Sequence, residues 1–144
     1  MRVLVDTCVV IDALQSREPF RKDAEALFLS AANKRFDGFL TAKSVADIYY
    51  LTHRATHSDS ESRRILSSLF KLFELLDTTG LDCRKALTSP LSDFEDAIMT
   101  ESALRAGVDC IVTRNERDYR CSPVPVCIPA ELLEKLEAGE GMGC

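Results

Sequence analysis

Short apolar runs in this chain end in acidic or other polar side chains, and this pattern limits the fold more than any other feature. Val3-Leu4-Val5 runs directly into Asp6, and Cys110-Ile111-Val112 runs into a polar segment that holds Asn115 and Asp118. A buried parallel strand has such an apolar sequence, and the carboxyl ends of parallel strands form the edge where open α/β sheets bind ligands. Carboxylates gathered there would repel one another, so the pattern favours a bound divalent cation.

Extended and helical patterns alternate along the whole chain. Apolar runs predict strands at residues 2–6, 38–41, 73–76, 109–113 and 126–128. Apolar side chains at helical spacing predict helices that include residues 7–15, 20–31, 45–52, 59–70, 93–106 and 129–136. Such alternation is typical of a parallel sheet sandwiched by helices. The sequence therefore predicts a single α/β domain over residues 1–137, with a flexible C-terminal tail at residues 138–144.

Several residues mark the expected helix ends. Asp6 or Thr7 can cap the first helix, and Pro19 suits the first turn of the second. Ser92 is a natural N-cap residue, and Gly107 is suited to follow the helix that ends at residue 106. Residues 78–90 have no clear pattern, although residues 83–87 fit a helical turn.

The composition is that of a globular protein with an excess of acids. Of the 144 residues, 46% are hydrophobic, and the formal net charge is −5. Domains that bind nucleic acids by bulk electrostatics are usually basic, so this charge argues against that class. It leaves open an enzyme that meets phosphates through bound metal and a local basic patch. The arginines that could form such a patch, or could equally be solvated surface residues, are Arg54, Arg63, Arg64, Arg114 and Arg117.

The cysteines indicate a reducing environment. The six cysteines form no CxxC pair, and Cys8, Cys110 and Cys127 lie in apolar runs, where a thiol behaves as a small hydrophobe. We find no signal-peptide pattern and no apolar stretch that approaches the length of a membrane span. We therefore expect a cytoplasmic protein with reduced thiols and no membrane association. A disulfide scaffold or a zinc site is the weaker alternative.

Three aspartates are the first candidates for an acidic site. Asp6 ends a predicted strand, and its alternative role is that of a helix N-cap. Asp47 lies in the helix that follows strand 38–41, and its alternative is an ordinary solvent-facing position. Asp96 precedes Ala97-Ile98 and so can point toward the sheet. Its neighbours in the first helical turn instead fit the role of acids that complement the helix dipole.

A fourth group of polar residues follows the strand at 109–113. Thr113, Asn115 and Asp118 lie at or just beyond its end. Asn115 or Asp118 could instead be a turn residue. Each of these elements is a weak signal alone, and their order and placement together are much more specific.

Taken together, these segments resemble the PIN domain family, and above all the bacterial group that includes the VapC-type toxins of toxin–antitoxin pairs. The matching segments are Val-Leu-Val-Asp-Thr, Ser-Val-Ala-Asp-Ile-Tyr-Tyr, Asp-Phe-Glu-Asp-Ala and Ile-Val-Thr-Arg-Asn-Glu-Arg-Asp-Tyr. The resemblance covers nearly the whole chain. It implies that the α/β domain is a PIN-like domain.

The resemblance also implies roles for individual residues. Asp6, Asp47 and Asp96 match the acids that would bind metal, although most members have glutamate at the place of Asp47. Asn115 occupies a place that many members fill with aspartate, and Asp118 lies three residues later. By the same resemblance, Asn115 and Asp118 support the site. Thr113 matches a hydroxyl residue often found beside the site, where it would orient a water or a carboxylate.

The function implied by the resemblance is a ribonuclease dependent on Mg²⁺ or Mn²⁺. Hard oxygen ligands suit both ions, and a bound ion would activate a water for attack on an RNA phosphodiester. The implied partners are the RNA substrate, a small antitoxin protein and a second copy of the chain in a homodimer. The main alternative is a non-catalytic PIN-like module that binds RNA or protein, because Asp47 and Asn115 deplete the acidic set.

Other signals point to different chemistry. A phosphatase that used Asp6 as nucleophile would commonly have a second acid within two residues, and Thr7 and Cys8 follow instead. His53 and His57 have the i, i+4 spacing of a helical zinc pair, but the accompanying glutamate base is missing. We expect two surface histidines, or an RNA phosphate contact by His53 and Arg54. Tyr49 and Tyr50 could stack on a base, although Tyr49 has the spacing of a core residue.

Overall fold

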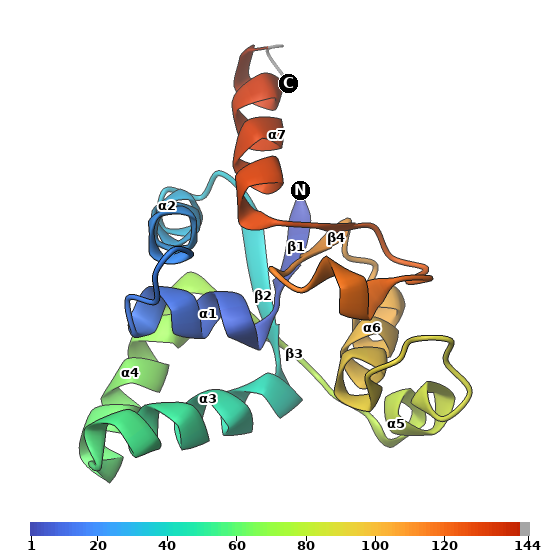
Figure 1. Ribbon diagram of the computed structural model, residues 1–144, viewed down its shortest axis with the longest axis horizontal. Coiled ribbons are helices and arrows are strands. Elements are labelled where there is room, and N and C mark those ends of the chain that lie inside the picture. Colours follow the sequence, from blue (N-terminus) through green and yellow to red (C-terminus); the bar gives the residue numbers. More distant parts are fainter. Residues whose placement is uncertain (142–144) are drawn as a thin grey trace.

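The protein is built around a five-stranded parallel sheet (Figure 1). The computed structural model describes residues 1–141, and residues 142–144 of the predicted tail lie outside the described residues. The strands are β1 (Arg2–Val5), β2 (Asp37–Thr41), β3 (Glu74–Leu76), β4 (Cys110–Val112) and β5 (Val126–Cys127). Their order is β3-β2-β1-β4-β5, and all neighbouring pairs are parallel. The predicted parallel α/β architecture is confirmed.

Helices cover both faces of the sheet. They are α1 (Thr7–Leu14), α2 (Arg21–Ala32), α3 (Ala42–Thr56), α4 (Asp59–Leu72), α5 (Gly80–Ala86), α6 (Phe94–Ala106) and α7 (Pro129–Gly141), with a short 3-10 helix η1 (Glu116–Tyr119). Figure 1 shows α1, α2 and α4 on one side of the sheet, and α5 and α6 on the other. Val3 and Val5 pack into the core under the first group, whereas Leu4 packs into the core under the second. Successive side chains of a strand point to opposite faces, so β1 is apolar throughout because both faces are buried.

The path of the chain places the amino-terminal strand at a switch point. From β1 the chain passes to β2 and β3 on one side, and it then returns to β4 and β5 on the other side. Ligands of open α/β sheets bind beside the carboxyl ends of the strands at such a point. The Asp6 N–H donates to the Val112 carbonyl at 3.0 Å, and the Thr113 N–H donates to the Cys127 carbonyl at 3.0 Å. The register of β1 with β4, in which Val5 lies opposite Val112, thus brings Asp6 and Thr113 together at this edge.

The helix ends correct some details of the sequence prediction. Asp93, and not Ser92, caps α6, because its carboxylate accepts the Asp96 N–H at 2.9 Å. Pro19 lies in the turn before α2, which begins at Arg21, and so it is not in the first helical turn. Gly107 ends α6 in the left-handed conformation with φ of 69°, as predicted.

Two helices are longer than the sequence indicated. Residues 83–87 were expected to form one turn, whereas α5 begins at Gly80. The Thr79 side chain accepts the Asp82 N–H, and the Asp82 side chain accepts the Thr79 N–H, which together stabilise this start. Helix α7 continues to Gly141, five residues past the predicted end at residue 136.

The five cysteines within the described residues are free thiols, and Cys144 lies outside that part of the chain. The five are Cys8, Cys83, Cys110, Cys121 and Cys127. Among residues 1–141, we find no helix with the length and apolar character needed to cross a membrane.

Candidate active site

A cavity of about 290 Å³ opens at the carboxyl edge of the sheet, between β1, α3 and α6. Its wall contains all three aspartates predicted as metal ligands, Asp6, Asp47 and Asp96. Glu95 adds a fourth carboxylate, and Lys43 is the lysine among the lining residues. Acids that are far apart in the sequence thus share one cavity, and negative groups outnumber positive ones in its wall.

Asp6 is held from several sides at the end of β1. Its residue is 8% exposed. Its Oδ2 atom accepts hydrogen bonds from the Thr113 hydroxyl at 2.8 Å and from the Tyr119 hydroxyl at 3.2 Å, and the Cys8 thiol lies 3.5 Å away. The backbone of Asp6 begins α1, but its side chain makes no capping hydrogen bond. Asp6 is thus the N-cap residue of α1, as the alternative expected, but its carboxylate lines the cavity and caps no helical amide.

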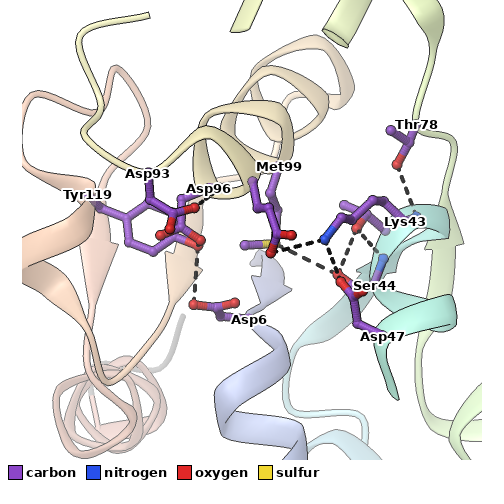
Figure 2. A network of polar contacts seen from close by, with 11 residues as sticks. Asp6, Lys43, Ser44, Asp47, Thr78, Asp93, Asp96, Met99 and Tyr119 are labelled. Atoms are coloured by element: carbon purple, nitrogen blue, oxygen red, sulfur yellow. Dashed lines mark hydrogen bonds and ion pairs between the residues drawn. The ribbon is translucent and has the colours of Figure 1, made fainter. Parts of the chain in front are cut away.

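Tyr119 connects the carboxylate of Asp6 with that of Asp96. Its hydroxyl lies 3.2 Å from Asp6 Oδ2 and 3.2 Å from Asp96 Oδ1, and its residue is 3% exposed (Figure 2). A phenol has one proton to donate, so it can satisfy only one of the two carboxylates at a time. The carboxylate pair therefore keeps acceptor capacity that the hydroxyl does not use.

The surroundings of the two acids raise their pKa values. Burial raises the pKa of Asp6, and the hydrogen bonds from Thr113 and Tyr119 offset this only in part. The pKa of Asp96 rises to about 7, because of burial first and then the negative charges of Asp6 and Asp93. A bound cation would relieve this repulsion, since an opposite charge favours the ionised form of a carboxylate.

Asp47 lies on the opposite wall of the cavity and is paired with a lysine. Lys43 Nζ lies 2.5 Å from Asp47 Oδ2 and 3.2 Å from Glu95 Oε2, so one ammonium bridges α3 and α6. The Thr41 hydroxyl accepts the Ser44 N–H and starts α3 directly after β2, which places this turn at the sheet edge. Figure 2 shows Lys43 and Asp47 grouped apart from Asp6 and Tyr119.

The remaining predicted residues lie beside the cavity. Thr113 is fully buried and donates to Asp6, which places it next to the acids as predicted. Asn115 is exposed, and its backbone N–H donates to the Thr113 hydroxyl at 3.0 Å. Asp118 is half-buried and does not line the cavity, although its negative charge contributes to raising the pKa of Asp96.

Two residues of the site were missed by the sequence analysis. Tyr119 was part of the matching segment, but an aromatic residue after a strand is usually a core residue. Lys43 precedes Asp47 by four residues on one helix, and this i, i+4 spacing of opposite charges is a signal that could have identified the pair. The contact between Lys43 and Glu95 depends on the fold and has no local signal.

The predicted basic patch is only partly available for a ligand. Arg63 pairs with Asp59, Arg64 pairs with Glu61, and Arg114 pairs with Asp12. The histidine pair is exposed, and the His53 ring stacks on Tyr49 with centroids 5.8 Å apart. The expectation of surface histidines is therefore confirmed.

The donors in the cavity fit a hard divalent cation. Within residues 1–141, no three Cys, His, Asp or Glu side chains form a ready-made cluster for an ion. Mg²⁺ keeps several waters and is usually bound through one or two carboxylates, and Asp6 with Asp96 supplies such a pair. The three-residue ligand set of Asp6, Asp47 and Asp96 stays a prediction.

The fold and cavity define an α/β protein with an acidic site at the switch point of a parallel sheet. The PIN domain profile matches residues 2–117, and the chain belongs to the PIN domain family. No protein with a curated description matches the chain by sequence.

Solved structures show the same fold at low sequence identity. VapBC2 from Rickettsia felis, bound to a DNA fragment from its promoter, is 13% identical with a TM-score of 0.65, over 89% of this chain and 98% of the other. A toxin–antitoxin complex from Klebsiella pneumoniae is 19% identical with a TM-score of 0.64, over 88% and 97%. VapC20 from Mycobacterium tuberculosis, a toxin that cleaves the sarcin-ricin loop, is 14% identical with a TM-score of 0.60, over 76% and 86%.

Proposed function

We propose that this protein is a ribonuclease dependent on Mg²⁺ or Mn²⁺, and that it is the toxin of a toxin–antitoxin pair. The observation that carries the proposal is the convergence of Asp6 and Asp96 on the Tyr119 hydroxyl, within a cavity that Asp47 and Glu95 also line. Membership of the PIN domain family supports it.

Asp6 and Asp96 would hold the metal ion, and Asp47 would contribute from the opposite wall. The bound ion would activate a water and neutralise negative charge on the RNA phosphate. Thr113 orients Asp6 by donating to Oδ2, which leaves Oδ1 of that carboxylate for the cavity. Tyr119 fixes the spacing of Asp6 and Asp96. The Lys43 ammonium lies where it can offset charge on a phosphate between α3 and α6.

A cleavage assay with a matched pair of variants tests the proposal. Unpaired RNA is incubated with Mn²⁺ and wild-type protein, with Asp6→Asn, or with Asp37→Asn. Asp37 is an exposed aspartate at the start of β2, so its variant makes the same chemical change at the opposite edge of the sheet. We expect product from wild type and Asp37→Asn, and little from Asp6→Asn. Equal product from all three proteins would show that the activity does not come from this site.

The second candidate function is a PIN-like module that binds RNA or protein without cleavage. The pairing of Asp47 with Lys43 and the exposed, uncharged Asn115 favour it. Metal-dependent stabilisation without product, over a range of RNA substrates, would support this module.

The partner assignments follow from the same proposal. Toxin–antitoxin complexes are among the structures of similar fold, so we expect a small antitoxin that blocks the cavity, and a homodimer of the toxin. Induction of the wild-type chain in bacteria should arrest growth, whereas Asp6→Asn should not. Growth arrest by both proteins would show that toxicity does not depend on Asp6.

A further inference from the structure

Two neighbouring tyrosines on α3 have different surroundings. The Tyr49 hydroxyl donates to the Asp59 carboxylate, and the Tyr49 ring stacks on His53. Tyr50 is 61% exposed and lines the cavity that contains Asp6. Tyr49 is therefore used to connect α3 with α4, whereas Tyr50 presents its ring at the cavity mouth.

A cation accompanies this exposed ring. The guanidinium carbon of Arg54, one helical turn after Tyr50, lies 5.8 Å from the Tyr50 ring centroid. Arg63, Arg64 and Arg114 each pair with a carboxylate, but no carboxylate within residues 1–141 forms an ion pair with Arg54. An aromatic face and an arginine without an acidic partner thus lie together beside an acidic cavity.

We propose that Tyr50 and Arg54 form a subsite for one unpaired nucleotide of the RNA, in which Tyr50 stacks on the base and Arg54 contacts the adjoining phosphate. This subsite rests on the proposed ribonuclease function. The net charge of −5 and the cavity acids repel the RNA backbone. Stacking is an attraction that does not depend on backbone charge, and it tolerates any base because every base has a π face.

The exposed position of the Tyr50 ring also determines that the bound nucleotide must be unstacked. An exposed ring can stack on a base only when that base has left its own helical stack, as bases do in loops and single strands. The base next to the cleaved bond would therefore rest on Tyr50, and the phosphate would extend toward the acids and Lys43. Tyr50 would act on binding and position the strand without taking part in bond cleavage.

Binding measurements without cleavage test this subsite. The full chain is titrated against a labelled single-stranded RNA of about ten nucleotides, in a buffer with EDTA, and anisotropy gives Kd. The variants are Tyr50→Leu, which keeps apolar bulk without a ring, and Tyr50→Phe, which keeps the ring. Arg54→Ala is compared with Lys22→Ala, which removes an exposed charge on α2 away from the cavity.

We expect Tyr50→Leu to weaken binding by about 5- to 150-fold, the range for loss of one stacked base, while Tyr50→Phe stays within about twofold of wild type. Arg54→Ala should reduce the slope of log Kd against log salt by about 0.7, as for one lost phosphate contact on a single strand. Lys22→Ala should leave that slope unchanged.

Three results would overturn the subsite: no binding of unpaired RNA by the wild type, equal affinity of Tyr50→Leu and wild type, or a loss with Tyr50→Phe as large as with Tyr50→Leu. Equal RNA affinity of Tyr50→Leu and wild type would indicate that the exposed face of Tyr50 binds a protein partner instead. The outcomes also separate the two proposals. Tyr50-dependent binding without metal-dependent cleavage would remove the ribonuclease function alone, and Tyr50-independent cleavage would remove the subsite alone.

Discussion

Two aspartates on the same side of the sheet have opposite electrostatic environments. Asp82 in α5 is 2% exposed and is bound by Arg105, at 3.0 and 3.1 Å, by the Ser102 hydroxyl at 2.8 Å and by the Thr79 N–H at 3.0 Å. Asp96 in α6 instead lies near three other aspartates. Burial acts to raise the pKa of Asp82, but the bonds from Arg105 and Thr79 outweigh it and hold that pKa below its ordinary value. The pKa of Asp96 is raised to about 7.

The difference distinguishes a structural carboxylate from one that is available to a ligand. Arg105 neutralises Asp82 within the chain, so its charge contributes to stability. The pair of Asp6 and Asp96 instead accepts hydrogen bonds from the neutral hydroxyls of Thr113 and Tyr119, which satisfy the two carboxylates only in part. Perturbed carboxylates in a cavity are typical of functional sites. We therefore expect the same change, Asp to Asn, to lower RNA cleavage at position 96 and to lower stability at position 82.

The largest expected effect is on RNA cleavage by Asp96→Asn. Loss of this carboxylate should lower the cleavage rate by about 10²-fold or more, because charge stabilisation by a bound ion is worth several kcal/mol and each 1.4 kcal/mol is about tenfold in rate. Because the change also removes like-charge repulsion, the free energy of unfolding at pH 8 should be equal or higher. Initial rates and urea unfolding measure the two quantities. Unaltered cleavage by a folded variant would contradict the assignment of Asp96.

At Asp82 the effect should fall on stability. Asp82→Asn leaves Arg105 without its carboxylate and weakens the start of α5, which should lower the free energy of unfolding by about 2–3 kcal/mol. Cleavage per folded molecule should not change. Urea midpoints measure the first expectation and rates below the unfolding transition the second. A variant as stable as wild type would show that the Arg105 pair is unimportant.

Variants of Asp82 and Asp96 should also differ in how strongly a metal ion stabilises them. An ion that binds only the folded state at 100 times its Kd stabilises by about 2.7 kcal/mol, which corresponds to a rise in Tm of about 5–10 °C. We expect this rise with Mn²⁺ for wild type and Asp82→Asn, and none for Asp96→Asn. Thermal scans at fixed protein concentration measure it. An equal rise in all three proteins would place the ion elsewhere.

The pH dependence of the metal-free protein's stability has a defined sign. The folded-state pKa of Asp96 is about 7, against an ordinary value of 3.8. The folded state therefore binds more protons between these values, and stability should fall as the pH rises from about 4 to about 7. Asp96→Asn should flatten this slope. The stabilisation from Asp82 has the opposite sign and should be lost as the pH falls below about 4.

Tyr119→Phe should have the smallest effect. It removes one hydroxyl and keeps the ring, so the free energy of unfolding should change by about 1 kcal/mol. Because the carboxylate pair loses the hydroxyl that holds its spacing, Mn²⁺ should bind more weakly, and the pKa of Asp96 should rise further. Calorimetric titration with Mn²⁺ measures the affinity. An affinity equal to that of wild type would show that the phenol does not position the pair.

Much of this site was predictable because it depends on strand ends. The apolar run before Asp6 and the run before Thr113 indicate parallel strands, and parallel strands place their carboxyl ends at one edge. Asp96 was predictable because the two apolar residues after it orient the first turn of α6. The sequence could not show whether Asp6 capped a helix, since that depends on the competing hydroxyls of Thr113 and Tyr119.

The contacts that were missed join distant segments without a periodic pattern. Tyr119 reaches Asp6 across 113 positions of the sequence, and Lys43 reaches Glu95 from another helix. The Asp82–Arg105 pair was missed for the same reason, because residues 78–90 lack the periodicity that would have predicted α5. Asn115 and Asp118 were predicted from the resemblance and from their place after a strand, and the local turn places both outside the cavity wall.

The central claim is that Asp6 and Asp96 together receive a divalent cation. Diffraction from crystals soaked in Mn²⁺ tests it most directly, through the anomalous signal of the ion. We predict a single strong peak at about 2.0–2.2 Å from an oxygen of Asp6 and of Asp96, with no peak at Asp82. Absence of a peak in this cavity at saturating Mn²⁺, or a peak that touches neither Asp6 nor Asp96, would contradict the account.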